Sequence, residues 1–385
     1  MKTLGIISEF NPFHNGHEYL LEKSKDLTGA DLAISIMSGD FVQRGESAVI
    51  DKFARSEVAM KSGFDMIVEM PIHITLQSAE YFALGSVKIL DKIGTDYLCF
   101  GIENEDADEF LKKVNILIDK SDELNALTKK YVGSTSFTKA RYDATVEILG
   151  DPSFISSNNI LGLEYIRAIN KIGSKMKAVP IKRISSINAD KDLRESNISS
   201  STAIRENIFN DYKSHVPVYS YEAIEKQKSD YGIQVLGYDF DLFRYLLLIE
   251  RRPMDGILGF EEGIDNYLAK IAGETMYFDE FIKSATTKRY TSARIRRLML
   301  NYILGNKPEF NDYEIGFYKV LAFNQRAEYL LKNSTLIPVM SKRDSFNLSD
   351  TDHIILSKML DASNLYNISL GKEINLDFKK KIRRY

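Results

Sequence analysis

Two histidines close to the start of the chain have a spacing that suits phosphate chemistry. In the string NPFHNGH, residues 11–17, His14 and His17 flank Gly16, and the whole chain has only five histidines. Two imidazoles at one place can donate hydrogen bonds to phosphate oxygens near pH 7 without a fixed charge. Phosphoryl and nucleotidyl transfer depend mainly on positioning and on charge stabilisation at phosphorus. The spacing therefore predicts that His14 and His17 are catalytic residues of such a transfer.

A simpler alternative is an ordinary helix N-terminus, in which one histidine is the N-cap and Gly16 is a turn residue. The surroundings favour the phosphate site, because the apolar run Leu4–Ser8 predicts a strand before the motif and the spacing in His17–Asp26 predicts a helix after it. Pro12 fixes the turn between them. In a doubly wound sheet, ligands bind beyond the carboxyl ends of the strands, and a helix N-terminus there is an anion site.

The elements that position this site follow from the first two hundred residues, where apolar runs alternate with helical spacing. Continuous apolar strands suit a parallel sheet that is covered on both faces, and the alternation predicts a doubly wound, Rossmann-like α/β domain. Strands are expected at Leu4–Ser8, Leu32–Met37, Met66–Met70, Tyr97–Phe100 and Val179–Ile184, and helices at His17–Asp26, Asp51–Lys61, Glu80–Ile93, Leu161–Ile172 and Ser199–Ile208.

With 385 residues, the chain is long enough for two or three domains. The α/β domain is predicted over 1–215, with a charged helical insertion at about 103–149, and a mainly α-helical C-terminal domain over 216–385. In the second part, helices are expected at Phe240–Glu250, Ile264–Ile271, Thr291–Leu304 and Asp312–Leu331, and a strand at Leu336–Met340.

Composition limits the class of protein. The net charge is −3 and hydrophobic residues make up 44%, so a nucleic-acid site has to be a local basic patch on an ordinary globular protein. The single cysteine, Cys99, excludes an internal disulfide and lies in an apolar run. No apolar stretch approaches a membrane span and the start of the chain does not resemble a signal peptide, so a cytoplasmic protein without a membrane is expected. The sequence suggests no protein partner.

One stretch has the local charge that RNA needs. Residues 288–297 contain five cations and no acid, and Thr291 and Ser292 are natural caps for a helix that follows. Arg294 and Arg297 should share its polar face. Cations at a helix start are unfavourable unless they meet phosphates, which favours RNA backbone binding over a solvated surface. The predicted RNA-binding residues are Lys288, Arg289, Arg294, Arg296 and Arg297. The basic residues 378–385 could add to this RNA contact, but a solvated end is the favoured interpretation.

Three further groups of residues have both a functional interpretation and a purely structural one. The hydroxyls of Ser200 and Ser201 with Arg205 predict a second anion cradle; the alternative is an N-cap with a surface arginine. Asp40, Gln43 and Arg44 follow the second strand and could bind phosphate, acetate or a metal, or form a solvated loop. Lys52 and Arg55 open a helix and suggest an anionic partner, with surface charge as the simpler account.

The motif also carries a family resemblance. HNGH after a strand is similar to the phosphate-binding motif of nucleotidyltransferases, and EFNPFHNGH, residues 9–17, resembles the bacterial tRNA(Met) cytidine acetate ligases. Further blocks match this family in order: SGDFVQRGE at 38–46, DKFAR at 51–55, FGIE at 100–103, NNILGLEY at 158–165, IKR at 181–183 and KRYTSARIRR at 288–297. Together they cover about residues 1–305.

The resemblance implies an activity and a set of contacts. Acetate and ATP would form acetyl-adenylate, whose acetyl group passes to the wobble cytidine of elongator tRNA(Met), giving N4-acetylcytidine. The helical domain would present the anticodon loop. The ATP-binding residues implied by position are Gly101, Asn158 or Asn159, Arg183 and the whole segment Ile7, Ser8, Glu9, Phe10, Asn11, Pro12, Phe13, His14, Asn15, Gly16, His17, Glu18, Tyr19 and Leu20.

The resemblance has one departure, and two other functions stay open. Where the family has a Tyr-His-Asp step, this chain reads Asn188-Ala189-Asp190. A small-molecule adenylyltransferase would share the first motif, and a nucleotide-gated RNA-binding protein would bind ATP without releasing pyrophosphate. No resident metal is expected, because His73, His215 and His353 are scattered. Mg²⁺ brought in with ATP needs only phosphates, waters and one carboxylate.

Overall fold

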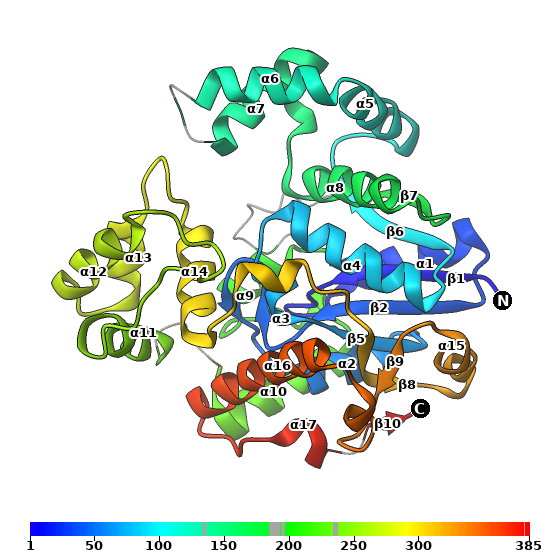
Figure 1. Ribbon diagram of the computed structural model, residues 1–385. Helices are drawn as coiled ribbons and strands as arrows, with labels where there is room; N and C mark the ends of the chain where they lie inside the picture. Colours follow the sequence, from blue (N-terminus) through cyan, green and yellow to red (C-terminus); the bar gives the residue numbers. More distant parts are fainter. Residues whose placement is uncertain (133–134, 136, 185–192, 194–196, 234–237, 381) are drawn as a thin grey trace.

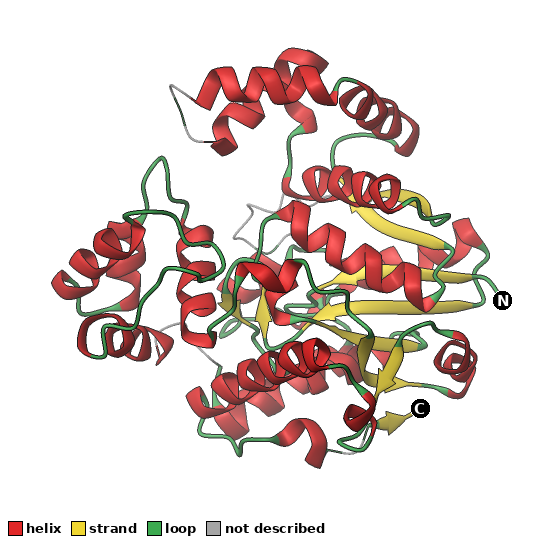
Figure 2. Cartoon of the chain, in the orientation of Figure 1, coloured by secondary structure: helices red, strands yellow, loops and turns green. Residues whose placement is uncertain are grey.

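The computed structural model describes residues 1–132, 135, 137–184, 193, 197–233, 238–380 and 382–385. The Asn188-Ala189-Asp190 departure lies outside these residues. The fold is a twisted, mostly parallel sheet with helices on both faces, a helical lobe on one side and a helical insertion above it (Figures 1 and 2). The predicted α/β class is therefore confirmed.

Eight strands form the main sheet, in the order β10-β8-β5-β2-β1-β6-β7, with β9 beside β8. Only the pair β5–β8 is antiparallel, and the remaining neighbours are parallel. The strands are β1 (Thr3–Ser8), β2 (Leu32–Ser38), β5 (Met66–Met70), β6 (Tyr97–Ile102), β7 (Lys177–Lys182), β8 (Phe317–Phe323), β9 (Ile337–Val339) and β10 (Arg383–Arg384). A separate hairpin pairs β3 (Phe41–Val42) with β4 (Glu46–Ser47).

Alternating residues of the strands bury two separate faces. Ile34 of β2 belongs to the core under α4 (Ala79–Ile93) and α8 (Ser157–Ile172), whereas Ala33 and Met37 belong to the core under α1 (Asn15–Thr28) and α2 (Lys52–Lys61). The order of the parallel strands reverses between the neighbours β1 and β6, because β1 leads to β2 on one side and β6 leads to β7 on the other. Such a switch point opens a crevice beyond the carboxyl ends of the strands, which is where residues 9–17 lie.

Two helical regions flank this sheet. The segment predicted as an insertion forms α5 (Ala107–Asp119), α6 (Ser121–Val132) and α7 (Phe137–Leu149), drawn at the top of Figure 1. The second region has its own core over residues 240–302. It comprises α11 (Tyr238–Arg244), a π-helical turn (Tyr245–Ile249), α12 (Ile264–Glu274), α13 (Phe278–Ala285) and α14 (Ser292–Leu304).

After α14 the chain returns to the sheet. The prediction of a helix over Asp312–Leu331 is wrong, because residues 317–323 form β8 beside β5. Within the basic segment 378–385, Arg383 and Arg384 form β10, which pairs with β8, whereas Lys379 and Lys380 are exposed as predicted. The other helices are α3 (Ile72–Thr75), α9 (Ser201–Glu206), α10 (Val218–Tyr231), α15 (Glu328–Asn333), α16 (Asp350–Ser369) and α17 (Leu376–Lys379), and 3-10 turns lie at Pro152–Phe154, Lys213–His215, Pro308–Asn311, Gln325–Ala327 and Asp344–Asn347.

Candidate active site

The two histidines hold each other and the start of α1 in a capping box. His14 is the N-cap, and its Nδ1 accepts a hydrogen bond from the Gly16 N–H at 3.0 Å. His17 Nδ1 accepts the His14 N–H at 3.2 Å. Since both Nδ1 atoms are acceptors, each neutral ring carries its proton on Nε2. The capping interpretation is thus correct for the Nδ1 atoms, and it leaves the Nε2–H groups as donors for a ligand.

Both imidazoles are neutral near pH 7. Burial, reinforced by Arg183, lowers the pKa of His17 to about 3, and burial followed by the nearby His17 lowers the pKa of His14 well below its usual value. The two ring centroids are 3.8 Å apart. Phe10 and Phe13 pack against His17, with centroids at 5.0 and 5.4 Å. The pair is therefore a fixed set of neutral donors.

Gly16 is required by the ring of His14. A Cβ at this position would lie 2.9 Å from Cε1 and 3.0 Å from Nδ1 of His14. Contacts this short do not occur without a shift, so any side chain here would displace the imidazole. The absence of a side chain at Gly16 thus makes room for His14.

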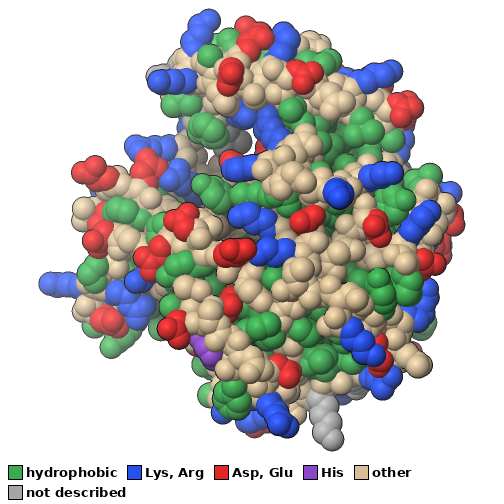
Figure 3. Space-filling model, turned by 45° about the vertical axis from the view of Figure 1, so that its right-hand side comes forward, with side chains coloured by type: hydrophobic (Ala, Val, Ile, Leu, Met, Phe, Trp, Pro, Cys, Tyr) green, Lys and Arg blue, Asp and Glu red, His purple; other side chains and the backbone are tan. Residues whose placement is uncertain are grey.

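The histidines line a cavity of about 1240 Å³ that extends from the carboxyl ends of β1 and β6 to the helical insertion. Figure 3 shows the insertion set off from the body of the molecule above a hollow. Most of the predicted ATP-binding residues line this cavity. They are Ile7, Ser8, Glu9, Phe10, Asn11, His14, Gly16, His17, Tyr19, Leu20, Gly101, Asn158, Arg183, Ser201 and Arg205. Residues 9–17 and 201–205, far apart in sequence, are thus brought together.

Several predicted residues have structural partners instead. Asn159 is fully buried, and its amide bonds to the backbone of Glu103 and Phe154, so Asn158 is the member of the pair on the cavity wall. Ser200 caps α9 through a 3.1 Å bond from the Ala203 N–H. Pro12 and Phe13 are buried.

Two polar residues of the motif also tie other segments to α1. Asn15 donates to the carbonyls of Asn197 and Ser214 at 2.7 and 2.9 Å. Glu18 accepts from the Tyr219 hydroxyl. These bonds hold the segments after residue 197 against α1, which places α9 beside the histidines.

Arginines supply the positive charge on the cavity wall. Arg205 donates to the Asn11 carbonyl at 2.8 Å, so it bridges α9 and the loop after β1. Arg183 lies beside Gly101, where an added Cβ would be 3.0 Å from Arg183 Cγ. Burial raises the pKa of Glu9, a carboxylate on the same cavity lining, and its Oε1 accepts the Gln43 N–H at 2.6 Å. The wall therefore has a positive end suited to an anion.

Comparison with known proteins identifies the family. A model described as HIGH Nucleotidyl Transferase matches residues 1–381. The tRNA(Met) cytidine acetate ligase of Caldanaerobacter subterraneus subsp. tengcongensis is 34% identical over 384 residues, 96% of each chain, and that of Thermosipho melanesiensis is 36% identical over 89% of this chain and 84% of its own. The chain belongs to the tRNA(Met) cytidine acetate ligase family. The predicted resemblance is confirmed, and the protein is a ligase built on a nucleotidyltransferase fold.

Solved structures agree with this assignment. Apo Thermotoga maritima TmcAL superposes with a TM-score of 0.89 at 30% identity, with both chains fully covered. The same protein bound with alpha-thio ATP superposes with a TM-score of 0.87 at 29% identity, covering 100% of this chain and 99% of the other.

In this ligase the basic stretch 288–297 is largely paired within the chain. Arg289 and Arg294 both bind Glu261, and Arg296 pairs with Glu46 at 3.0 Å. Arg297 turns to the cavity wall and donates to the Gln43 carbonyl at 3.4 Å. Arg294 and Arg297 therefore do not share one solvated face. The sequence could not reveal the two acids, which lie in distant segments. The tRNA-binding role of this stretch stays a prediction.

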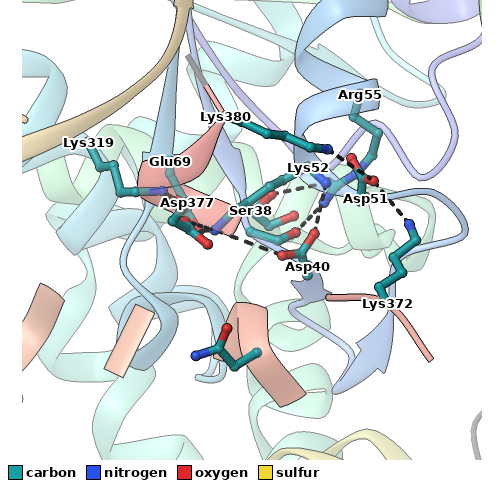
Figure 4. Close-up of polar contacts among 12 residues, drawn as sticks. Ser38, Asp40, Asp51, Lys52, Arg55, Glu69, Lys319, Lys372, Asp377 and Lys380 are labelled. Carbon is teal, nitrogen blue, oxygen red and sulfur yellow. Dashed lines mark hydrogen bonds and ion pairs between the residues drawn. The ribbon is translucent and has the colours of Figure 1, made fainter. Parts of the chain in front are cut away.

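A second charged group lies behind the site, in what we call the buried lysine cluster: Lys52, Lys319, Asp40, Glu69 and Asp377 (Figure 4). Lys52 is wholly inaccessible and bonds Glu69 at 2.8 Å and Asp377 at 2.6 Å. Surface charge is therefore the wrong account of Lys52, and its anionic partners lie within the chain. Asp40 belongs to this cluster and not to the cavity wall, whereas Gln43 and Arg44 do line the cavity.

Arg55 is a positioning residue that the sequence did not reveal as such. Its side chain is fully buried and donates to the carbonyls of Glu9 at 2.7 Å, Ser38 at 3.1 Å and Ile50 at 3.0 Å, and also to Gly39. It thereby joins the ends of β1 and β2 behind the histidines.

Among the residues that the structure describes, no group of three or more His, Cys, Asp or Glu side chains is arranged to hold a metal ion. None of the described helices combines the length and the apolar character that crossing a bilayer requires.

Proposed function

We propose that the protein condenses acetate with ATP to acetyl-adenylate and then acetylates the wobble cytidine of elongator tRNA(Met). The observation that carries this proposal is the pair of neutral imidazoles on the wall of one cavity with Arg183 and Arg205. The names of the relatives supply the acyl group and the RNA, and the alpha-thio ATP complex of the Thermotoga maritima protein supports ATP as the nucleotide.

The first step is a displacement at the α-phosphorus of ATP. A carboxylate oxygen of acetate forms a bond to phosphorus as the bond to the β-phosphate oxygen breaks, and pyrophosphate leaves. Negative charge builds on the non-bridging oxygens, and the Nε2–H groups of His14 and His17 stabilise it without moving a proton. Mg²⁺ arriving with ATP would be held by the phosphates and water.

The second step uses the rest of the cavity. The N4 amine of cytidine attacks the acetyl carbonyl and gives up one proton to water, the C–O bond to the phosphate breaks, and AMP leaves with N4-acetylcytidine as product. At about 1240 Å³ the cavity exceeds the roughly 300–1,000 Å³ of a usual small-molecule site, so it has room for a second substrate. An unpaired anticodon base can be splayed into such a pocket, and the walls exclude water from the mixed anhydride.

The basic stretch at the start of α14 is the proposed contact with the anticodon stem-loop. Lys288 and Arg289 are exposed there, and Arg289 lies close to Arg294 at Glu261. Because Arg289 and Arg294 share Glu261, binding a phosphate means replacing that carboxylate, which favours modest affinity and a strong salt dependence.

The test combines the protein with labelled acetate, ATP and bulk tRNA, followed by digestion of the RNA to nucleosides. We expect labelled N4-acetylcytidine, and pyrophosphate release that requires acetate. Pyrophosphate release without acetate would instead indicate a small-molecule adenylyltransferase, and ATP binding with no release would indicate an RNA-binding protein without catalysis.

A further inference from the structure

Arg297 differs from the other arginines at the start of α14 in what it bonds. Arg289, Arg294 and Arg296 each have a carboxylate partner. Within the described part of the chain, the hydrogen-bond partner of Arg297 is the backbone carbonyl of Gln43, at 3.4 Å. Arg297 is partly buried, and burial, with a smaller contribution from Arg294, lowers its pKa to about 10, so at pH 7 it is still a cation that has lost part of its hydration.

A desolvated cation without a carboxylate is costly. Removing a charge from water carries a penalty of several kcal/mol unless an opposite charge and hydrogen bonds replace the water. The neutral Gln43 carbonyl replaces only a small part of the lost hydration of Arg297. Because Arg297 lines the cavity, an anionic ligand can supply the rest. A guanidinium binds phosphate or carboxylate through two parallel hydrogen bonds.

The position of Arg297 is set by close backbone packing and not by a free loop. Gly45, in the β3–β4 hairpin, has a φ of +71°, and a Cβ there would lie 2.6 Å from the Arg297 nitrogen. Only glycine permits this approach of the hairpin to α14. The hairpin and α14 also share an apolar core through Phe41 and Leu300. The guanidinium is thus presented to the cavity by two elements that lock together.

The surrounding charges indicate which anion fits. Gln43 links Arg297 to Glu9, because the Gln43 carbonyl accepts from Arg297 and the Gln43 N–H donates to Glu9. Arg205 and Arg44 both act electrostatically on Glu9, so they lie at this same end of the cavity. Glu9 and Glu46 lie at this end too, but Glu46 is paired with Arg296, so positive charge is in excess and suits a polyanion better than the single carboxylate of acetate. The charges of Arg183 and Arg205 both act electrostatically on His14, where the α-phosphate is predicted to lie. Since Arg205 is common to His14 and to the group around Arg297, the β- and γ-phosphates can extend from His14 toward Arg297.

We propose that Arg297 binds the β- and γ-phosphates of ATP, so that the helical lobe contributes a residue to the nucleotide site. The proposal rests on the proposed function only in taking ATP as the nucleotide. It moves Arg297 from the RNA-binding set to the nucleotide-binding set.

The experiment measures the affinities of ATP and AMP by calorimetry for the wild type, Arg297→Gln, Arg297→Lys and Arg252→Gln. Arg252 is the control for removal of an arginine outside the cavity, because it also donates to a backbone carbonyl, that of Tyr302 at 3.4 Å, pairs in addition with Glu250, and does not line the cavity. For Arg297→Gln we expect an ATP affinity lower by about 10- to 100-fold, the size of lost charge-assisted hydrogen bonds, with AMP affinity unchanged within about twofold. Arg297→Lys should fall between, and Arg252→Gln should match the wild type.

Three results would overturn the proposal. Equal losses for ATP and AMP would mean that Arg297 supports the cavity walls. Unchanged ATP affinity with a raised KM for acetate would assign Arg297 to the carboxylate, and unchanged ATP affinity with weaker tRNA binding would return it to the RNA. The calorimetric assay uses neither acetate nor tRNA, so its outcome is independent of acetyl transfer. A protein that makes no N4-acetylcytidine but shows the ATP-specific loss would disprove the proposed function and keep Arg297 as a phosphate-binding residue.

Discussion

Two regions at the carboxyl edge of the sheet bury charged side chains, and they balance the charge differently. In the buried lysine cluster, beyond β2 and β5, Lys52 and Lys319 each bond both Glu69 and Asp377. In the cavity, beyond β1 and β6, the histidines are neutral and Arg297 has a backbone carbonyl in place of a carboxylate. The two regions are joined by Arg55, which bonds the ends of β1 and β2.

The difference separates a structural role from a binding role. Buried charges that are paired with opposite charges of the same chain contribute to the uniqueness of the fold. They are not available to bind a ligand. Charges that are desolvated but poorly compensated are stabilised by an anion that arrives from outside. Four substitutions or conditions test this contrast, from the largest expected effect to the smallest.

The strongest effect is expected in the buried lysine cluster. Asp377→Asn removes one carboxylate from between Lys52 and Lys319, and breaking a buried pair in this way costs about 3–5 kcal/mol. We expect a loss of this size in the free energy of unfolding, measured with urea. Glu373→Gln is the control, because its pair with Lys379 is exposed and should leave the unfolding midpoint unchanged. An Asp377→Asn protein as stable as the wild type would contradict the structural role.

The second effect concerns catalysis without loss of the fold. Asparagine at position 14 is a good N-cap and glutamine at position 17 completes a capping box, so His14→Asn and His17→Gln keep the bonds that Nδ1 makes while removing Nε2–H. We expect acetate-dependent pyrophosphate release to fall by about 10²–10³ for each variant, as for loss of one donor to a reacting oxyanion. Wild-type rates in both variants would mean that the two histidines only cap the helix and are not catalytic.

A third effect is steric and acts through Arg183. In Gly101→Val the new Cβ would lie 3.0 Å from Arg183 Cγ and 3.2 Å from Cδ, which forces the guanidinium away from the cavity. We expect ATP affinity to fall about tenfold, the worth of one charge-assisted hydrogen bond. Gly273→Val, at a helical position with nothing within 4 Å of the added Cβ, should bind ATP like the wild type. Equal affinities in a calorimetric titration would remove Gly101 and Arg183 from the site.

The smallest effect is a pH dependence of stability that His17 produces. Its pKa is about 3 in the folded protein and near 6.5 when unfolded, so below pH 6.5 the unfolded state binds more protons. The contribution is complete above pH 6.5 and is lost as the pH falls toward 3. Between pH 6.5 and 5.5 the loss is about 1 kcal/mol. Urea unfolding at these two pH values should show a smaller decrease for His17→Gln than for the wild type by that amount; equal decreases would mean that His17 is not desolvated.

The parallel strands could be predicted from the sequence because their signal is local. Leu32–Ser38 and Met66–Met70 are nearly continuous apolar runs, which is the pattern of strands covered on both faces. The His14–Gly16–His17 spacing is equally local, since a strand, a turn and a helix start lie within about twenty residues. That is why the position of the site could be predicted, although the use of each Nδ1 in the capping box could not.

What the sequence did not reveal depends on partners far along the chain. Lys319 interrupts the apolar run of β8 and looks like an exposed helical charge until Glu69 and Asp377 are brought beside it. Arg297 has the same local pattern as Arg294, and only the hairpin that carries Gln43 distinguishes them. Burial of a charge is decided by tertiary contacts, which no period or motif encodes.

The long sequence separation inside the buried lysine cluster has a consequence for synthesis of the protein. Asp377 bonds Lys52 across 325 positions, and β10 joins the sheet from residues 383–384. A ribosome adds about 5–20 residues per second, so the nucleotide-binding half waits on the order of tens of seconds for its last carboxylate. During that interval the cluster around Lys52 and Glu69 lacks Asp377, and a chain that is truncated before residue 377 never acquires this carboxylate. The buried lysine cluster can therefore form completely only after the segment that carries Asp377 has left the ribosome.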